Sequence, residues 1–450
     1  MRIDWAAEKE EALARLARML RFDTVNPPGN ELALARDLAA EAASWGVESD
    51  VYVSAESRGN LVVRLRGDGS QRPLLLLSHL DVVPAESDKW RFPPFAGIRS
   101  EGYIWGRGAI DSKLTGALHM QVVSLVKRLG LPLTRDIVLV AAADEEFGGH
   151  YGLEWMVREH PSVFDAEFGI NEAGGFAIPV NGQHLYTVQV GEKGSANLDL
   201  VASGRPGHSS VPHDDNAIFH LATVLAAMAD KKMPHRPPAS VRAFFERAAS
   251  VQTDERVAAD LRALLDGDGC DEALGRLPVN AATRSMFDAM LRNTCAPTVM
   301  ASGLKRNVIP SRAEVQLSGR PLPGVSEGVF LAEVEALAGS QVAYEMHSFR
   351  PGVEFDHETP LFHALDAALR HFDAQGVAVP YMQTGGTDAR FLVDLDMVVY
   401  GFVPMRWEPG LEFFELCHGH DERVSEANVL FGVQVLSDAV ARLNGLSIGG

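Results

Sequence analysis

The hydrophobic positions of the chain form two patterns, which predict helices and buried strands. Apolar residues recur at helical spacing near 8–20, from about Glu31 to Trp45, and in 113–129, 152–159 and 426–443. Short uninterrupted apolar runs lie between them: LVV at 61–63, LLLL at 74–77, IVLVAAA at 137–143, FGI at 168–170 and MVVYGFV at 397–403. Continuous runs favour strands covered on both faces, as in a parallel sheet under helices. We therefore predict an α/β domain with a mixed, mostly parallel sheet sandwiched by helices.

A different pattern begins near residue 193. SANLDLVA and AEVQLS alternate between apolar and polar residues, as half-exposed antiparallel strands do. The order strand, helix, strand, strand, helix, strand over 195–349 predicts an α+β ferredoxin-like unit. A polar, helical insertion at about 231–300 interrupts it. The predicted organisation is a discontinuous α/β domain, 1–192 and 350–450, with the domain 193–349 inserted.

Composition and charge narrow the class of protein. The chain has 450 residues, more than the roughly 250–300 at which single cores stop growing, so two domains are expected. The net charge of −19 argues against nucleic acid or an anionic membrane as a partner. Neither a signal-peptide pattern nor an apolar stretch of about 20 residues is present. With only three scattered cysteines, these features predict a soluble, cytoplasmic protein.

Residues capable of chemistry follow the apolar runs. The runs lead to Ser78-His79-Leu80-Asp81, Asp144-Glu145-Glu146, Asn171-Glu172 and, after a loop, Cys417-His418-Gly419-His420. In open α/β sheets ligands bind at the carboxyl ends of the strands, so these four segments are expected to converge. Asp111, in GRGAIDSK, precedes a helix that begins near Lys113; taken alone, it is an N-cap.

The donor types predict a metal site. Adjacent carboxylates straight after a buried strand force charge toward the interior, where an unpaired charge is costly and a cation neutralises it. Two imidazoles with three carboxylates suit zinc, manganese or cobalt better than magnesium or calcium. Spacing alone does not decide between Glu145 and Glu146, or between His418 and His420, as ligands.

Eight motifs carry a family resemblance. SHLDVVPA, GRGAIDSK, ADEEFGG, NEAGG, GHSSVP, RNVIP, GGTDAR and HGHDERVS follow one another across 78–425. Together they resemble the co-catalytic metallopeptidase family of aminoacylase, acetylornithine deacetylase, succinyl-diaminopimelate desuccinylase and carboxypeptidases G and S. The spacing looks closest to the carboxypeptidase S-like and acyl-amino-acid hydrolase branch. The resemblance implies a zinc exopeptidase-like catalytic domain and makes 193–349 a lid and dimerisation domain.

The resemblance also implies a role for each motif residue. Two divalent metal ions, zinc rather than cobalt or manganese, would be held by His79, Asp111, Glu146, Glu172 and His418. Asp111 would bridge the ions, Asp81 would orient His79, and Glu145 would be the general base that activates a hydroxide shared by the metals. His208 would stabilise the tetrahedral intermediate from the partner subunit of a homodimer. Substrate contacts would come from Arg320, Asn307, Gly385, Gly386 and Thr387.

The predicted function is hydrolysis of an amide bond next to a free carboxylate, on small N-acyl amino acids. Arg320 supports the carboxylate because a guanidinium binds it bidentately. The alternative within enzymes is a dipeptidase or carboxypeptidase acting on short peptides. A non-catalytic binding protein that retains the fold is the alternative outside enzymes, and it would be expected to have lost a ligand or the base.

Overall fold

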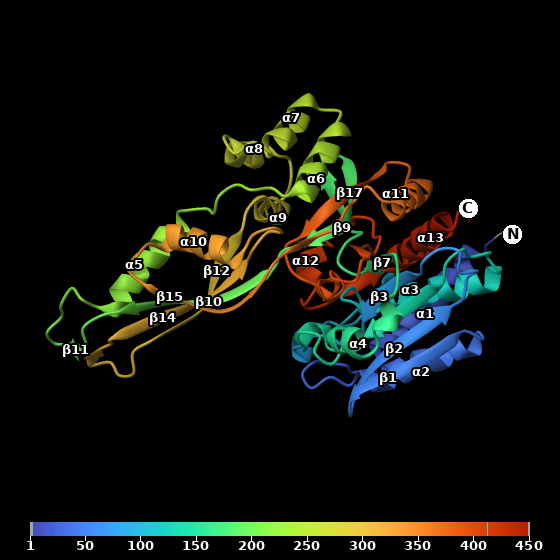
Figure 1. Ribbon diagram of the computed structural model, residues 1–450, viewed down its shortest axis with the longest axis horizontal. Helices are drawn as coiled ribbons and strands as arrows, with labels where there is room; N and C mark the ends of the chain where they lie inside the picture. The colour runs from blue at the N-terminus through green and yellow to red at the C-terminus, as the bar shows by residue number, and fades with distance from the viewer. Residues whose placement is uncertain (1–2, 412, 449–450) are drawn as a thin grey trace. The chain divides into compact units, whose positions relative to one another are not determined.

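The computed structural model describes residues 3–411 and 413–448 and divides into two compact units (Figure 1). Unit 1 runs to Val190 and resumes over Phe355–Tyr381 and from Thr387 onward. Unit 2 comprises Gly191–Glu354 and Met382–Gly386. No helix of the described residues is long and apolar enough to span a membrane.

Unit 1 is built on a mixed sheet with a parallel centre. The strand order is β1-β2-β6-β3-β7-β18-β9, with β8 and β17 also paired to β9. The strands are β1 (Glu48–Ala55), β2 (Arg58–Leu65), β3 (Leu74–His79), β6 (Ile137–Ala142), β7 (Phe168–Asn171), β8 (Ala177–Val180), β9 (Gln183–Glu192), β17 (Gly376–Gln383) and β18 (Val398–Gly401). The central strands β6, β3, β7 and β18 are parallel. The predicted α/β class with a mixed sheet is confirmed.

One strand differs from the expectation. The run at 61–63 lies in β2, which is antiparallel to both β1 and β6. The sequence does not distinguish β2 from a parallel strand, because most of β2 is buried. A strand covered on both faces has the same continuous apolar run whether it pairs in parallel or antiparallel.

Helices cover both faces of the central strands. The helices of unit 1 are α1 (Trp5–Leu20), α2 (Glu31–Ser44), α3 (Lys113–Leu129), α4 (Leu153–Glu159), α11 (Pro360–Phe372), α12 (Phe413–Leu416) and α13 (Glu426–Leu443). Leu75 and Leu77 of β3 share a core cluster with Leu153 of α4, whereas Ser78, on the other face, approaches Gly116 of α3. A small sheet, order β19-β5-β4, joins Arg423–Ser425, Tyr103–Trp105 and Ile98–Ser100.

Unit 2 contains a four-stranded antiparallel sheet of order β12-β14-β10-β15. Its elements follow the chain as β10 (Ser195–Ser203), α5 (Ala217–Ala229), β12 (Thr294–Ser302), β14 (Arg312–Arg320), α10 (Glu327–Ala338) and β15 (Ala343–Arg350). This is the order and pairing of a ferredoxin-like unit. Alternation sets the faces of β10: Leu198 and Leu200 are buried in the cluster that includes α5 and α10, while Asn197 is exposed.

The remaining elements of unit 2 are four helices and three short strands. The helices are α6 (Ala239–Ser250), α7 (Glu255–Ala263), α8 (Cys270–Arg276) and α9 (Ala281–Leu291), and the strands are β11 (Gly207–His208), β13 (Val308–Ile309) and β16 (Val353–Glu354). The helices lie in the expected insertion, but its last residues, from 294, belong to strand β12. Phe244, Phe245 and Phe287 pack edge to face at the centre of the helices, so the segment has an apolar core of its own.

Candidate dinuclear metal centre

The candidate centre lies where three parallel strands of unit 1 end. His79 is the last residue of β3, and Glu172 directly follows β7. Glu145 and Glu146 begin the short 3-10 turn η2 (Glu145–Phe147), which comes after β6. The register pairs His79 with Ala142, so the ends of β3 and β6 are level and their polar extensions meet.

One group of donors surrounds His79. Its Nε2 atom lies 3.0 Å from Oε2 of Glu172 and 3.1 Å from Oδ1 of Asp111. His79, Glu145 and Glu172 each offer a donor atom within 4.8 Å of the others, and so do His79, Asp111 and Glu146. These separations allow a single cation to be bound by several donors at once.

A second group shares Asp111. Nε2 of His418 lies 3.2 Å from Oδ2 of Asp111 and 3.2 Å from Oε2 of Glu146. Asp111 therefore presents one oxygen to each imidazole, which is the arrangement of a bridging carboxylate. The capping role that the sequence suggested for Asp111 taken alone is wrong, because Ser112 occupies the N-cap position of α3. His420 lies elsewhere, 3.0 Å from Glu86.

Asp81 contacts both His79 and the turn that carries Glu145 and Glu146. The Nδ1 atom of His79 lies 3.0 Å from the Asp81 carbonyl oxygen and 3.4 Å from its carboxylate. The two carboxylate oxygens accept the backbone N–H groups of Glu145 and Glu146, at 3.1 Å each. Asn26 donates a further bond of 2.8 Å to Asp81. The side chain thus fixes an imidazole and a turn carrying two carboxylates.

The charges of the cluster explain its fit to divalent cations. Burial and the Glu172 carboxylate raise the pKa of Glu145, and burial raises the pKa of Glu146 to about 6. Burial opposes a charge on Asp111 as well, but hydrogen bonds from His418 and His79 lower its pKa. Oε1 of Glu146 is buried and has no hydrogen-bond partner among the described residues. A bound cation would satisfy that oxygen and neutralise the repulsion, so the residues fit two metal ions.

Sequence reasoning missed two residues beside Glu145. Arg390, in the turn η4 (Asp388–Phe391), places its guanidinium 3.7 Å from the Glu145 carboxylate and 3.6 Å from Asp388. Asp388 is buried, and burial raises its pKa to about 7. Both residues belong to the motif GGTDAR, but only its Gly-Gly-Thr portion was expected to have a role. In the structure the Thr387 hydroxyl accepts bonds from Asn171 and from the backbone of Ala389.

The predicted substrate residues of unit 2 fall into two places. His208 pairs with Val308 in the two-stranded sheet of β11 and β13, and Ser209 donates its backbone N–H to the Asn307 carbonyl. Arg320 is the last residue of β14 and Arg312 is the first. The Arg312 end lies next to the small sheet, because the backbone N–H of Gly204 donates to the carbonyl oxygen of Ser311. At about 3.3 Å per residue β14 spans roughly 25 Å. The structure therefore brings Asn307 to His208 but not to Arg320, although the sequence grouped Asn307 with Arg320.

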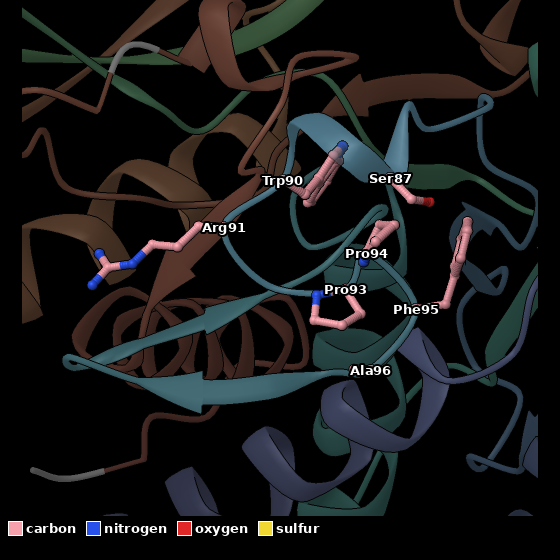
Figure 2. Close-up of a pocket in the computed structure, with 7 residues that line it drawn as sticks. All are labelled: Ser87, Trp90, Arg91, Pro93, Pro94, Phe95 and Ala96. Atoms are coloured by element: carbon pink, nitrogen blue, oxygen red, sulfur yellow. The ribbon is translucent and has the colours of Figure 1, made fainter.

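A surface pocket of about 520 Å³ also lies in unit 1, in the segment that connects β3 to β4 (Figure 2). It is lined by Ser87, Trp90, Arg91, Pro93, Pro94, Phe95 and Ala96. None of these residues belongs to the predicted site. Figure 2 shows the Arg91 side chain extending away from the Trp90 ring.

Comparisons with known proteins agree with this geometry. Residues 75–442 match the model of Peptidase family M20/M25/M40. Human N-fatty-acyl-amino acid synthase/hydrolase PM20D1 is 28% identical over 394 residues, covering 83% of this chain and 75% of that protein. Aminoacylase-1 of Sus scrofa is 27% identical, covering 94% of this chain and 93% of that protein. The crystal structure of the M20 family metallo-carboxypeptidase Sso-CP2 from Sulfolobus solfataricus has a TM-score of 0.69 at 18% identity, covering 97% of this chain and 100% of that chain.

Fold and sequence together define a hydrolase of C–N bonds with a candidate dinuclear metal centre. The chain belongs to peptidase family M20/M25/M40, which confirms the resemblance drawn from the eight motifs.

Proposed function

We propose that this protein hydrolyses the amide bond of N-acyl amino acids at a centre that binds two zinc ions. The observation that carries the proposal is the position of Asp111 between His79 and His418, with one carboxylate oxygen toward each imidazole. Each imidazole also has a carboxylate of its own, Glu172 or Glu146. A single metal ion would not require this division of the donors into two groups that share one residue.

The proposed ligands are His79 and Glu172 for one ion and His418 and Glu146 for the other, with Asp111 common to both. Imidazole and carboxylate donors suit zinc, and cobalt or manganese would use the same set. When bound, the ions polarise the scissile carbonyl and lower the pKa of the attacking water.

The proposed general base is Glu145. It is the carboxylate of the adjacent pair that lies near Arg390, whereas Glu146 faces His418. Glu145 takes a proton from the attacking water and transfers it to the amide nitrogen as the C–N bond breaks, so the products are a carboxylic acid and an amine. Asp81 fixes the backbone of Glu145 and thereby its reach.

An N-acyl amino acid is the proposed substrate because two of the relatives are named for such substrates. Arg320 is proposed to bind the carboxylate of the amino acid, since a guanidinium forms two parallel bonds with it. Gly385 and Gly386 would allow close approach of the substrate backbone. A dipeptidase or carboxypeptidase, which accepts a free amine on the acyl side, is the second candidate.

We further infer a homodimer formed through unit 2, in which His208 acts on the partner's substrate. The separation of Asn307 from Arg320 supports this, because one chain does not bring both to a single carboxylate. The sheet edge supports it as well: Val299 and Met300 are exposed on the edge strand β12. An exposed apolar edge strand is a template for pairing with another chain.

The three free cysteines fit the proposed cytoplasmic location.

Replacement of Glu145 tests the function. Glu145→Ala should lose at least about 100-fold in kcat on N-acetyl amino acids, as expected for a missing general base, while two metal ions per chain remain. Glu159→Ala, an exposed glutamate of α4, is the matched control and should keep full activity. Parallel assays on dipeptides, read by amine release, decide between the two enzyme candidates. Wild-type turnover of neither substrate would refute the function, and retained turnover in Glu145→Ala would refute the base.

A further inference from the structure

Arg107 and Glu422 form a buried ion pair that belongs to no ligand set. The Arg107 Nη1 and Glu422 Oε2 atoms lie 2.7 Å apart, and the two side chains are 2% and 0% exposed. Arg107 stands four residues before Asp111, and Glu422 stands four residues after His418. The pair, called here the loop clasp, therefore connects the two segments that carry these proposed ligands.

Glu422 fixes the backbone of the Asp111 segment. Its Oε1 accepts the backbone N–H groups of Ile110, at 2.7 Å, and of Asp111, at 3.0 Å. Its Oε2 accepts the backbone N–H of Gly108 at 3.1 Å. The main chain adds a bond from Gly106 to the Glu422 carbonyl. Three convergent amides and a guanidinium satisfy a carboxylate that would be costly to bury without them.

Arg107 fixes the backbone of the His418 segment. Its Nη2 donates to the carbonyl oxygens of His418, at 3.2 Å, and Gly419, at 3.0 Å. His418 has φ of +61°, in the left-handed region that a residue with a side chain rarely adopts. Only glycine fits at position 419, because the Cβ atom of any other residue would lie 2.2 Å from the Glu415 carbonyl oxygen. The guanidinium thus holds the carbonyls of a turn that is unfavourable by itself.

Trp90 packs against the loop clasp. The Arg107 guanidinium lies 5.1 Å from the centre of the buried Trp90 ring, a cation–π contact. The same tryptophan lines the pocket of Figure 2.

We propose that the loop clasp positions Asp111 and His418 for the metal ion that His418 and Glu146 hold, and so sets the affinity of that ion more than the affinity of the other ion. The proposal rests on the proposed function, in which these residues are ligands. Arg107 and Glu422 belong to neither proposed ligand set and act through the backbone of Asp111 and His418, so they are positioning residues. The ion at His79 and Glu172 shares Asp111, but its histidine is oriented by Asp81, which has no hydrogen bond to Arg107 or Glu422 among the described residues. That ion depends on the loop clasp through one ligand and the other ion through two, so it should lose less affinity.

Zinc titration of variants tests the proposal. Glu422→Gln keeps the size of the side chain but removes its charge and turns one acceptor into a donor. The metal-free protein is titrated with Zn²⁺ against a chromophoric chelator, at a temperature where circular dichroism shows it folded. Wild type should bind two ions, and Glu422→Gln should bind one of them about 10- to 100-fold more weakly, the usual effect of losing a partner behind a ligand.

A control and a second variant make the result decisive. Glu41→Gln is the control, because Glu41 also pairs with a buried arginine, Arg15, at 2.7 Å. Removing the Glu41 carboxylate should leave the affinities of both zinc ions unchanged. If Glu422→Gln does not fold, Arg107→Lys keeps the charge but cannot reach Glu422 and both carbonyls together, and it carries the same expectation. Unchanged affinities, or an equal loss at both sites, would overturn the proposal. A wild type that binds no zinc would instead refute the proposed function.

Discussion

The carboxylate of Asp81 lies 3.4 Å from Nδ1 of His79. The same carboxylate accepts hydrogen bonds from the backbone N–H groups of Glu145 and Glu146. Asp81→Ala should therefore reduce both metal affinity and kcat, because an imidazole and the turn bearing the base lose one shared support. A 10- to 100-fold loss in metal affinity is expected, as for other residues behind a ligand. Metal analysis and steady-state kinetics on the same preparations check this. A variant that keeps its metals and loses only kcat would show that Asp81 acts on Glu145 alone.

Arg390 should affect the base without affecting the metals. Its guanidinium lies between Glu145 and Asp388, at 3.7 and 3.6 Å, distances of ion pairs rather than of hydrogen bonds. Arg390→Ala should lower kcat by about 10-fold, since the Glu145 carboxylate loses a neighbouring positive charge. That loss corresponds to roughly 1.4 kcal/mol, between the ~1 kcal/mol of such a pair in bulk water and the ~4 kcal/mol near a protein surface. KM and metal content should stay near the wild-type values, and Arg390→Lys should restore part of kcat. Loss of zinc from Arg390→Ala would contradict this assignment.

The sequence predicts the ligand cluster and, through the family resemblance, Asp81 behind His79, but not the loop clasp or Arg390. Continuous apolar runs mark buried strands, and the ends of parallel strands meet at one sheet edge, so the sequence by itself indicates that His79, Glu145 and Glu172 lie together. The pairing of Arg107 with Glu422 leaves no such signal, because it joins residues 315 positions apart. Periodicity also does not give the direction of a strand that is buried on both faces. For that reason the antiparallel pairing of β2 was not predicted.

Removal of metal should destabilise unit 1. Without cations the carboxylates of Asp111, Glu145, Glu146 and Glu172 are held together in a largely buried cluster, and repulsion favours unfolding. A chelator should lower Tm, and Zn²⁺ at 100 times its Kd should restore about 2.7 kcal/mol of stability per ion. Thermal melts followed by circular dichroism, with Mg²⁺ as the comparison ion, measure this. Equal stabilisation by Mg²⁺ would contradict a centre with imidazole ligands.

We expect the buried side chain of His119 to make the stability of the protein depend on pH, independently of the metal centre. This histidine of α3 is fully buried, and neither ring nitrogen has a hydrogen-bond partner among the described residues. Burial lowers its pKa to about 3, so the folded state keeps it neutral while the unfolded state binds a proton below about pH 6.5. Its contribution to stability is therefore lost as pH falls from about 6.5 toward 3.

His119→Leu removes this titration. The stability of the variant relative to wild type should rise as pH falls, by about 2 kcal/mol between pH 7 and pH 5. Denaturant unfolding of both proteins at pH 7, 6 and 5 gives the difference. A difference that does not change with pH would show that His119 is accessible to protons in the folded state.

Arg320 predicts selectivity for a free carboxylate. A hydrogen bond to a charged partner contributes about 1.5–3 kcal/mol, so Arg320→Ala should lower kcat/KM for an N-acyl amino acid by about 10- to 150-fold. The same substitution should have little effect on the corresponding N-acyl amino acid amide, which has no negative charge to bind. Arg312→Ala is the matched control, because Arg312 begins the strand that Arg320 ends and pairs instead with Glu314 at 2.9 Å. Equal losses on the acid and the amide would show that Arg320 supports the fold of unit 2 rather than the substrate, and the carboxylate would then have to bind elsewhere.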